Sequence, residues 1–170
     1  MNEKINQIHI PVMPKEVISL LDINPFGKYV DGTCGLGGHS KLIQNNLSKE
    51  GALVALDLDQ KAIQNCKASL NKKKSKLFIK KESYSDLPNI LRSLNIDKVD
   101  GILLDLGLSS MQLDSNNRGF SFKKDAYLDM RFDQDKKIDA ASIINKSSKS
   151  ELADIIYNYG EERRSRAIAE

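Results

Sequence analysis

The sequence predicts an α/β protein built on a doubly wound, mostly parallel sheet. Short apolar runs rich in β-forming residues alternate with segments of helical spacing, and a glycine-rich turn directly follows the first run. Strands that alternate with helices in this way are joined by right-handed crossovers in a parallel sheet. The 170 residues are enough for one domain with its own core and too few for two ordinary ones.

Four runs are expected to form the strands, at 28–31, 52–57, 76–80 and 99–105. The second and fourth runs are apolar at nearly every position, which is typical of parallel strands covered on both faces. The third run alternates between apolar and polar residues, and this pattern suits a strand at the edge of the sheet.

Segments between and after the strands have the spacing of helices. One helix is expected to begin at Asp59, which is its cap, and to bury Ile63, Cys66 and Leu70 on one face. Another is expected after Asp86, which stands at the N-cap position before an apolar stripe made of Leu87, Ile90, Leu91 and Leu94.

The C-terminal part predicts further helices. Ser148 and Glu151 form a capping-box pattern, and Gly160 suits the end of the helix that they begin. A new helical pattern starts at Glu161 and still continues at Glu170. In contrast, residues 107–135 show no period, and a segment of this length usually carries function or ligand contacts.

Composition narrows the classes of function. The chain is 40% hydrophobic and 29% charged, with a formal charge of +3, which neither requires nor excludes a nucleic-acid partner. The basic run at 71–76 is interpreted as a solvated loop, with an RNA-facing patch as the alternative. No apolar run approaches the roughly 18–20 residues that span a bilayer, and residues 1–15 lack the apolar core of a signal peptide. Cys34 and Cys66 form neither a disulfide framework nor a metal-ligand pattern, so we expect a cytoplasmic protein without a metal site.

The strongest candidate site is the glycine-rich turn at 31–40. Gly35, Gly37 and Gly38 let a ligand approach the backbone where a Cβ would exclude it. Asp57 lies 20 residues past Gly37, at the tip of the second expected strand, where its carboxylate can accept hydrogen bonds from both hydroxyls of a ribose. The pattern therefore predicts a site for a nucleoside ligand.

The acid that precedes the turn indicates which nucleoside. Asp31 would repel a pyrophosphate but suits the ammonium of a methionine moiety. The turn also lacks the G-x-G-x-x-G spacing of dinucleotide sites. S-adenosylmethionine is therefore the favoured ligand and a dinucleotide the second choice. A purely turn-capping role for Asp31 is the structural alternative.

Further candidates follow the other strands. Asp105 ends the fourth run and is expected to face the transferable methyl group or the amino-acid end of the cofactor, with loop capping as the alternative. Tyr84 has a ring that can stack on adenine, and Gln112 has an amide that can bind polar groups of the cofactor. His39 is expected to bind backbone or ligand rather than to act as a base, and His9 is a weak candidate. No histidine is placed to make Cys34 a nucleophile.

These motifs together resemble the ribosomal RNA small-subunit methyltransferase H family, also called MraW. Five motifs of that family, preceded by its His-initiated stretch at 9–16, occur in order over essentially the whole chain: D-G-T-x-G-x-G-G-H-S at 31–40, D-G-I-L-L-D-L-G-x-S-S-x-Q-L-D at 100–114, R-G-F-S-F at 118–122, L-D-M-R at 128–131 and Y-G-E-E at 159–162.

The resemblance implies a Rossmann-like class I S-adenosylmethionine-dependent methyltransferase fold. It implies methyl transfer to N4 of a cytidine in the decoding region of 16S rRNA, with the small ribosomal subunit as partner. It also implies that S-adenosyl-L-methionine contacts Gly37, Gly38, His39, Asp57, Tyr84, Asp105 and Gln112. Tyr84 departs from the pattern, because the family often has phenylalanine there, but stacking should survive.

For the chemistry, Asp105 is the candidate acceptor of the proton from N4, with a backbone carbonyl as the alternative. Contacts to an exposed base are expected from Arg118, Phe120, Phe122 and Arg131, although core packing is the more ordinary role of the two phenylalanines. Residues 1–114 are expected to form the cofactor-binding part, and 115–170 the start of an inserted, mostly helical substrate-recognition region.

Family members are considerably longer than this chain, so the resemblance implies an N-terminal part that lacks the sheet beyond the fourth strand. That strand would then be an exposed apolar edge, and the chain alone is expected to bind the cofactor weakly and to methylate poorly or not at all. The alternatives are a methyltransferase for another nucleic-acid position and a module that only binds nucleotide or RNA. A nicotinamide dehydrogenase is disfavoured by Asp31 and by the glycine spacing.

Overall fold

The computed structural model describes residues 10–72 and 74–170. The chain divides into two compact units, Met1–Gly107 and Leu108–Glu170. His9 and Lys73, which belong to the first family motif and to the basic run, lie outside the described residues.

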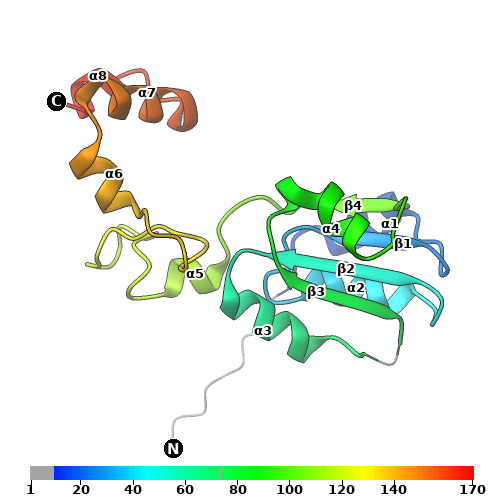
Figure 1. The fold of residues 1–170 in the computed structure, drawn as a ribbon. Coiled ribbons are helices and arrows are strands. Elements are labelled where there is room, and N and C mark those ends of the chain that lie inside the picture. The colour runs from blue at the N-terminus through cyan, green and yellow to red at the C-terminus, as the bar shows by residue number, and fades with distance from the viewer. Residues whose placement is uncertain (1–9, 73) are drawn as a thin grey trace, which may run out of the picture. The chain divides into compact units, whose positions relative to one another are not determined.

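The first unit alternates strands and helices (Figure 1). Its elements are α1 (Pro14–Leu21), β1 (Lys28–Asp31), α2 (Gly38–Asn46), β2 (Ala52–Asp57), α3 (Gln60–Ser69), β3 (Lys76–Lys81), the 3-10 helix η1 (Tyr84–Asp86), α4 (Leu87–Ser93) and β4 (Gly101–Leu103). The four strands expected from the sequence are thus confirmed, and β4 is shorter than its apolar run.

Within the described residues, the strands form one sheet in the order β3-β2-β1-β4. Every pairing is parallel, with Val30 of β1 opposite Val54 of β2 on one side and Ile102 of β4 on the other. Chain order runs outward from β1 to β3 and then returns to the far side of β1. The sheet therefore has a topological switch point between β1 and β4.

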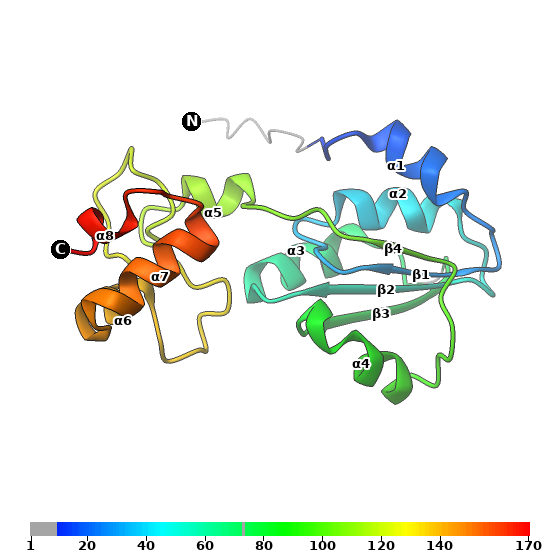
Figure 2. The same cartoon turned by 90° about the horizontal axis from the view of Figure 1, so that it is seen from above.

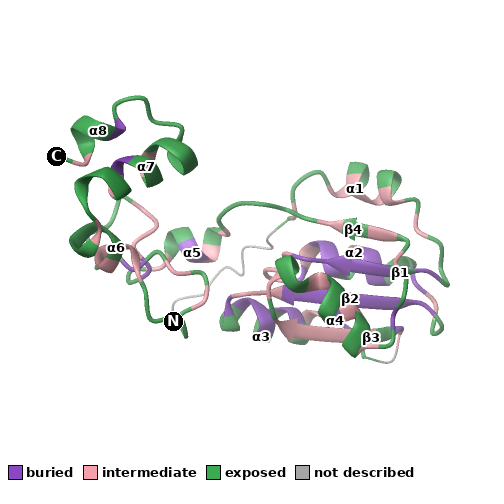
Figure 3. Ribbon diagram, turned by 45° about the horizontal axis from the view of Figure 1, so that its top comes forward, coloured by how far each residue is buried: buried purple, intermediate pink, exposed green. Residues whose placement is uncertain are grey.

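Helices cover both faces of this sheet, as the doubly wound fold class requires (Figure 2). Tyr29 and Leu53 point to the face covered by α1, α2 and α3, whereas Val30 and Val54 point to the face covered by α4. The alternation follows from the period of two along a strand. Figure 3 shows β1 and β2 buried at nearly every residue.

The fourth strand corrects one expectation. Its apolar run predicts a strand covered on both faces, yet Ile102 is 48% exposed, and Leu104 just beyond it is also exposed. The reason is position: β4 is the last strand of the described sheet and pairs only with β1, which is the exposed apolar edge that the family resemblance implied. The expectation that β3 is an edge strand is confirmed by its place at the opposite end of the order.

Helix caps agree with the sequence in part. Asp59 accepts a hydrogen bond from the backbone N–H of Lys61 and so caps α3, as expected. Asp86 occupies the N-cap position of α4 but makes no capping bond; Ser83 instead caps the preceding η1. The side chain of Asp86 is occupied by Asn89, whose amide donates to it.

The second unit contains α5 (Ser110–Asp114), α6 (Ala140–Lys146), α7 (Lys149–Gly160) and α8 (Ser165–Ile168). The capping box of Ser148 and Glu151 begins α7 as predicted. The helix ends at Gly160, but Glu161, with φ 53°, is the left-handed residue that closes it. The helical pattern expected from residue 161 is limited to α8, and the aperiodic segment 107–135 contains the five-residue helix α5.

Candidate functional site

The carboxyl ends of the strands of the first unit meet at one edge of the sheet, because all the pairings are parallel. In open α/β sheets ligands bind at this edge, at the switch point. Here the turn after β1 and the segment after β4 flank that point. Thr33 joins them, since its Oγ1 accepts a hydrogen bond of 2.8 Å from the backbone N–H of Asp105.

Main-chain bonds tie the glycine-rich turn to the strands beside it. Gly32 donates to the carbonyl of Leu103, and Cys34 donates to the carbonyl of Leu56, at 2.9 and 2.8 Å. The turn is therefore anchored to β4 on one side and to β2 on the other. Its shape is set by the sheet and is not that of a free loop.

Two glycines are required by close approach. A Cβ on Gly37, whose φ is +85°, would lie 2.1 Å from Oγ of Ser69 and 3.2 Å from Cα of Cys66. A Cβ on Gly32 would lie 2.5 Å from Cδ2 of Leu104 and 3.1 Å from Cβ of Tyr84. The turn thus packs directly on α3 and on the segments that follow β3 and β4.

Asp57 is held at the end of β2 in a form suited to a further ligand. Oδ2 accepts from the backbone N–H of Gly35 at 2.9 Å, and Oδ1 accepts from that of Asp59 at 2.9 Å. Asp57 is half-buried. A carboxylate has about four acceptor positions, so each oxygen can still accept a hydroxyl. Two protein bonds fix the carboxylate, and the remaining lone pairs are available for a diol.

Asp31 is more enclosed than the sequence suggests. It is 1% exposed, with Oδ2 accepting from the Ser40 hydroxyl at 2.5 Å and Oδ1 accepting from the backbone N–H of Thr33 at 3.2 Å. Burial raises the pKa of this carboxyl, while the bonds from Ser40 and Thr33 act in the opposite direction. In the structure both oxygens serve the turn, and any contact to a ligand comes in addition to that role.

His39 is the second residue of α2 and is 6% exposed. Among the described residues, neither ring nitrogen has a hydrogen-bond partner. Oδ2 of Asp105 lies 3.7 Å from Nε2 of His39. The Asp105 side chain is 46% exposed, so the pair extends from the buried turn to the surface.

Tyr84 begins η1, directly beyond β3, and is 41% exposed. Its Cβ is one of the atoms nearest to Gly32, so the structure brings it to the same edge as the turn. Asp31 and Asp57 are the last residues of β1 and β2, and Tyr84 and Asp105 follow β3 and β4, so the four residues converge at one edge. With three carboxylates there, the site favours a cationic ligand over a pyrophosphate.

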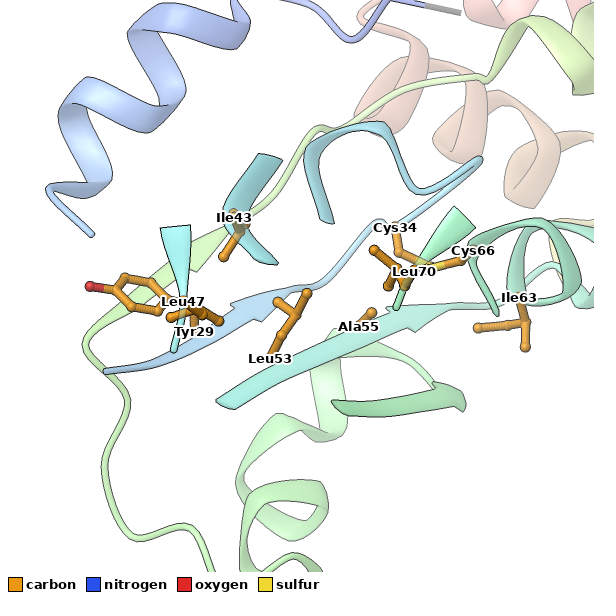
Figure 4. Packing of buried hydrophobic residues seen from close by; sticks show 9 residues of the cluster. All are labelled: Tyr29, Cys34, Ile43, Leu47, Leu53, Ala55, Ile63, Cys66 and Leu70. Atoms are coloured by element: carbon orange, nitrogen blue, oxygen red, sulfur yellow. The ribbon is translucent and has the colours of Figure 1, made fainter. Parts of the chain in front are cut away.

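Cys34, within the turn, and Cys66, in α3, both have their side chains in the core. Cys34 and Cys66 are 4% and 0% exposed, and Figure 4 shows them side by side in the core. Contact with the Cys66 thiol and burial raise the pKa of Cys34. A thiol held protonated in this way is a poor nucleophile, which agrees with the sequence-based interpretation.

Gln112 belongs to the second unit, where it is 5% exposed in α5. Its side-chain oxygen accepts from the backbone N–H of Ser109, and Oγ of Ser109 accepts from the backbone N–H of Gln112. The side-chain amide that the sequence predicts to bind the cofactor thus completes a capping box. Its contact with a cofactor stays a prediction.

The four residues nominated for RNA differ in exposure. Arg118 is 3% exposed and donates to the carbonyls of Arg131 and Phe132. Arg131 donates through Nε and an Nη to both oxygens of Asp129, at 2.7 and 2.8 Å. The ring of Phe120 packs 5.4 Å from that of Phe132.

Phe122 is different, since it is 99% exposed. Of the four nominated residues, it has the side chain most available to a partner. The other three hold the segment between α5 and α6 together, and their contact with RNA stays a prediction.

Sequence reasoning did not single out Thr33 and Ser40, although both stand in the glycine-rich motif. Their hydroxyls bond Asp105 and Asp31, respectively. The signal was present in the sequence, as hydroxyl residues two and nine positions after Asp31. Their partners, however, are fixed only by the fold.

The described part of the chain contains no helix long and apolar enough to cross a membrane. Nor does it contain a cluster of three or more histidine, cysteine or acidic residues that could hold a metal ion.

Comparison with known proteins adds a family. The family model described as the MraW methylase family matches residues 6–170. Ribosomal RNA small subunit methyltransferase H of Caldicellulosiruptor saccharolyticus is 50% identical over 161 residues, which cover 95% of this chain and 52% of that protein.

Two further relatives carry the same name. The one from Fusobacterium nucleatum is 46% identical and covers 98% of this chain, and the one from Thermosipho africanus is 48% identical and covers 95%. Those matches extend over 54% and 55% of the two relatives. The chain therefore spans about half the length of the curated relatives that it matches.

Proposed function

The chain belongs to the MraW methylase family, and from this premise we propose that it binds S-adenosyl-L-methionine and takes part in methylating N4 of a cytidine in 16S rRNA. The observation that carries the proposal is the glycine-rich turn after β1, with Asp57 bonded to its Gly35 N–H at 2.9 Å. The substrate is assigned from the family resemblance and from the relatives, which are named as methyltransferases of small-subunit ribosomal RNA. An enzyme acting on ribosomes is also expected to be cytoplasmic.

The residues at the sheet edge fit the proposed cofactor. The ribose hydroxyls would donate to the free lone pairs of Asp57, and the Cβ position of the neighbouring Gly35 is open, with the nearest atom, the Thr33 carbonyl oxygen, 3.9 Å away. His39 supplies a buried polar group whose ring nitrogens have no partner among the described residues. Buried polar groups are almost always hydrogen-bonded, so the two unpaired nitrogens call for partners, and a ligand at the turn could supply one of them.

Charge supports the same ligand. Adenosylmethionine carries two positive groups, a sulfonium and an ammonium, whereas a dinucleotide carries a negative pyrophosphate. Asp31, Asp57 and Asp105 place three acidic side chains around the turn. Carboxylates attract the former and repel the latter, an effect that increases where water is excluded.

When bound, the cofactor supplies a methyl group on a positively charged sulfur. The chain's own residues would then position the acceptor amine in line with it, since the delocalised lone pair of N4 makes a weak nucleophile. Asp105, half-exposed at the mouth of the site, is our candidate to accept the proton that N4 loses. Tyr84, at the same edge, would stack on the adenine.

Calorimetric titration of the 170-residue chain with adenosylmethionine tests the cofactor assignment. NAD serves as the control ligand. We expect binding of adenosylmethionine alone, lost in Asp57→Ala. Binding of NAD instead, or unchanged affinity in Asp57→Ala, would contradict the proposal.

The substrate is tested separately with radiolabelled cofactor and unmethylated small ribosomal subunits. Duplex DNA is the control acceptor. Transfer by this chain is expected to be weak at most, and digestion of the labelled RNA followed by mass spectrometry should locate any transferred methyl group on N4 of a cytidine. Label at another position, or on DNA, would show that the assigned substrate is wrong. If Asp105→Ala leaves turnover intact at saturating cofactor, the proton-accepting role of Asp105 is excluded.

A further inference from the structure

His39 is buried in a way that calls for a partner. Its side chain is 7% exposed, and both ring nitrogens are without a hydrogen bond among the described residues. Leaving a ring nitrogen unpaired in the interior is unfavourable, because the group has lost its bonds to water. A stable arrangement therefore gives at least one of the two nitrogens a partner.

Asp105 is placed to be that partner. The distance from Nε2 of His39 to Oδ2 of Asp105 is 3.7 Å, which is too long for a hydrogen bond and less than 1 Å from one. The main chain of Asp105 is already fixed, since its N–H donates to Oγ1 of Thr33 at 2.8 Å. A movement of less than 1 Å between the two side chains would therefore form the bond without breaking that of the Asp105 N–H.

The surroundings of the imidazole also favour Asp105 as its partner. Asp31 is a second carboxylate that interacts with His39, but its two oxygens are occupied by Ser40 and by the N–H of Thr33. Asp105 has its side chain 46% exposed, at the opening of the site. A hydrogen bond donated by His39 to one oxygen of Asp105 would fix the direction in which the other oxygen points.

We propose that His39 is the positioning residue of Asp105: its Nε2–H donates to Oδ2 and turns Oδ1 toward the cationic, methionine-derived part of the cofactor. The proposal rests on the proposed function, because it assumes that adenosylmethionine occupies this edge. His39 need not touch the reacting atoms for this role. Its effect on the ligand passes through the carboxylate of Asp105.

Two ligands separate this role from a general packing role. Adenosylmethionine carries the sulfonium and the ammonium, whereas 5′-methylthioadenosine has the same nucleoside without either charge. In His39→Leu, the affinity for adenosylmethionine should fall about tenfold or more, the effect of one hydrogen bond to a charged group, and that for methylthioadenosine should stay the same. Equal losses for the two ligands would show that His39 supports the whole site, and would overturn the proposal.

Conservative variants locate the donor on the ring. The amide nitrogen of glutamine reaches the place of Nε2, and that of asparagine the place of Nδ1. His39→Gln should therefore restore adenosylmethionine binding, and His39→Asn should not. The reverse order would overturn the proposal. Thermal unfolding monitored by circular dichroism shows whether each variant is folded under the conditions of the binding measurement.

A double-mutant cycle with Asp105→Ala completes the test. Once the carboxylate is absent, adding His39→Leu should weaken adenosylmethionine binding no further. If the fold losses of affinity in the two single variants multiply in the double variant, the two residues act independently. That result overturns the inference and leaves the proposed function standing. Failure of the unmodified chain to bind adenosylmethionine at all would overturn both.

Discussion

Gly37 offers the sharpest test of how the glycine-rich turn is built. We compare Gly37→Ala with Gly35→Ala, because both residues have a left-handed backbone, with φ of +85° and +51°. Placing an alanine in that region costs about 1–2 kcal/mol of folding free energy. The two sites differ in their surroundings: the Cβ of alanine at 35 would meet only the carbonyl of Thr33, at 3.9 Å.

At Gly37 the added methyl group meets α3. Its Cβ would lie 2.1 Å from Oγ of Ser69, which donates to the carbonyl of Cys66 at 2.9 Å. The hydroxyl has to rotate away, and the lost hydrogen bond costs about 0.5–1.5 kcal/mol. Adding the backbone cost gives about 1.5–3.5 kcal/mol for Gly37→Ala, against about 1–2 kcal/mol for Gly35→Ala.

Urea unfolding followed by circular dichroism measures both losses of free energy. Ser69→Ala removes the clashing hydroxyl, so the double variant Gly37→Ala/Ser69→Ala should lose less than the sum of the two single losses. Two results would refute the reasoning: equal stability of the Gly35 and Gly37 variants, or strict additivity with Ser69→Ala. Either would mean that the turn does not pack on α3 as the structure has it.

Three further predictions concern other parts of the chain. Hydrogen bonds from Arg131 lower the pKa of Asp129. The stability that this pair contributes is therefore complete above the usual aspartate pKa of about 3.9 and is lost as the pH falls through the lower, folded-state value. Asp129→Asn should cost about 1–3 kcal/mol of folding free energy at pH 7 and flatten the dependence of stability on pH between 5 and 2, and an unchanged pH dependence would contradict the pairing. Phe122→Ala should leave the melting temperature unchanged, because the ring is 99% exposed, and weaken binding to small-subunit RNA in a filter assay, by about 1–3 kcal/mol if the ring stacks on a base; unchanged RNA affinity would exclude it from the interface. Iodoacetamide at pH 7.5 should leave Cys34 and Cys66 unmodified in native protein and modify both in urea, since they are 4% and 0% exposed; rapid alkylation of the native protein, seen by mass spectrometry, would show that the core beneath the turn opens.

The sequence by itself determined the elements whose signals are local. The apolar run at 52–57 predicts β2 with its observed bounds, because a strand buried on both faces needs an apolar residue at every position. Asp59 and the pair Ser148 and Glu151 identified helix starts, since a capping bond spans only two or three residues. The sequence also indicated the glycine-rich turn and Asp57 as a candidate site, from the spacing between one strand end and the next.

Only the tertiary structure decided which side chains meet. Thr33 and Asp105 are separated by 72 residues, and their bond exists because β4 returns to lie beside β1. The same return places β4 at the end of the described sheet, an exposed edge that the family resemblance implied and the apolar run alone did not. Exposure was equally undetermined: Arg118 is enclosed while Phe122 is open to solvent, against the ordinary preference of both residue types.

The physical reason is the range of each interaction. Capping, backbone preference and the period of an apolar face act within a few residues, so they leave a trace in the sequence. Burial and side-chain pairing depend on which distant segments the fold brings together. The sequence therefore identified the residues of the turn as a candidate site, while the fold decided that His39 faces Asp105 and that Asp31 is held by Ser40.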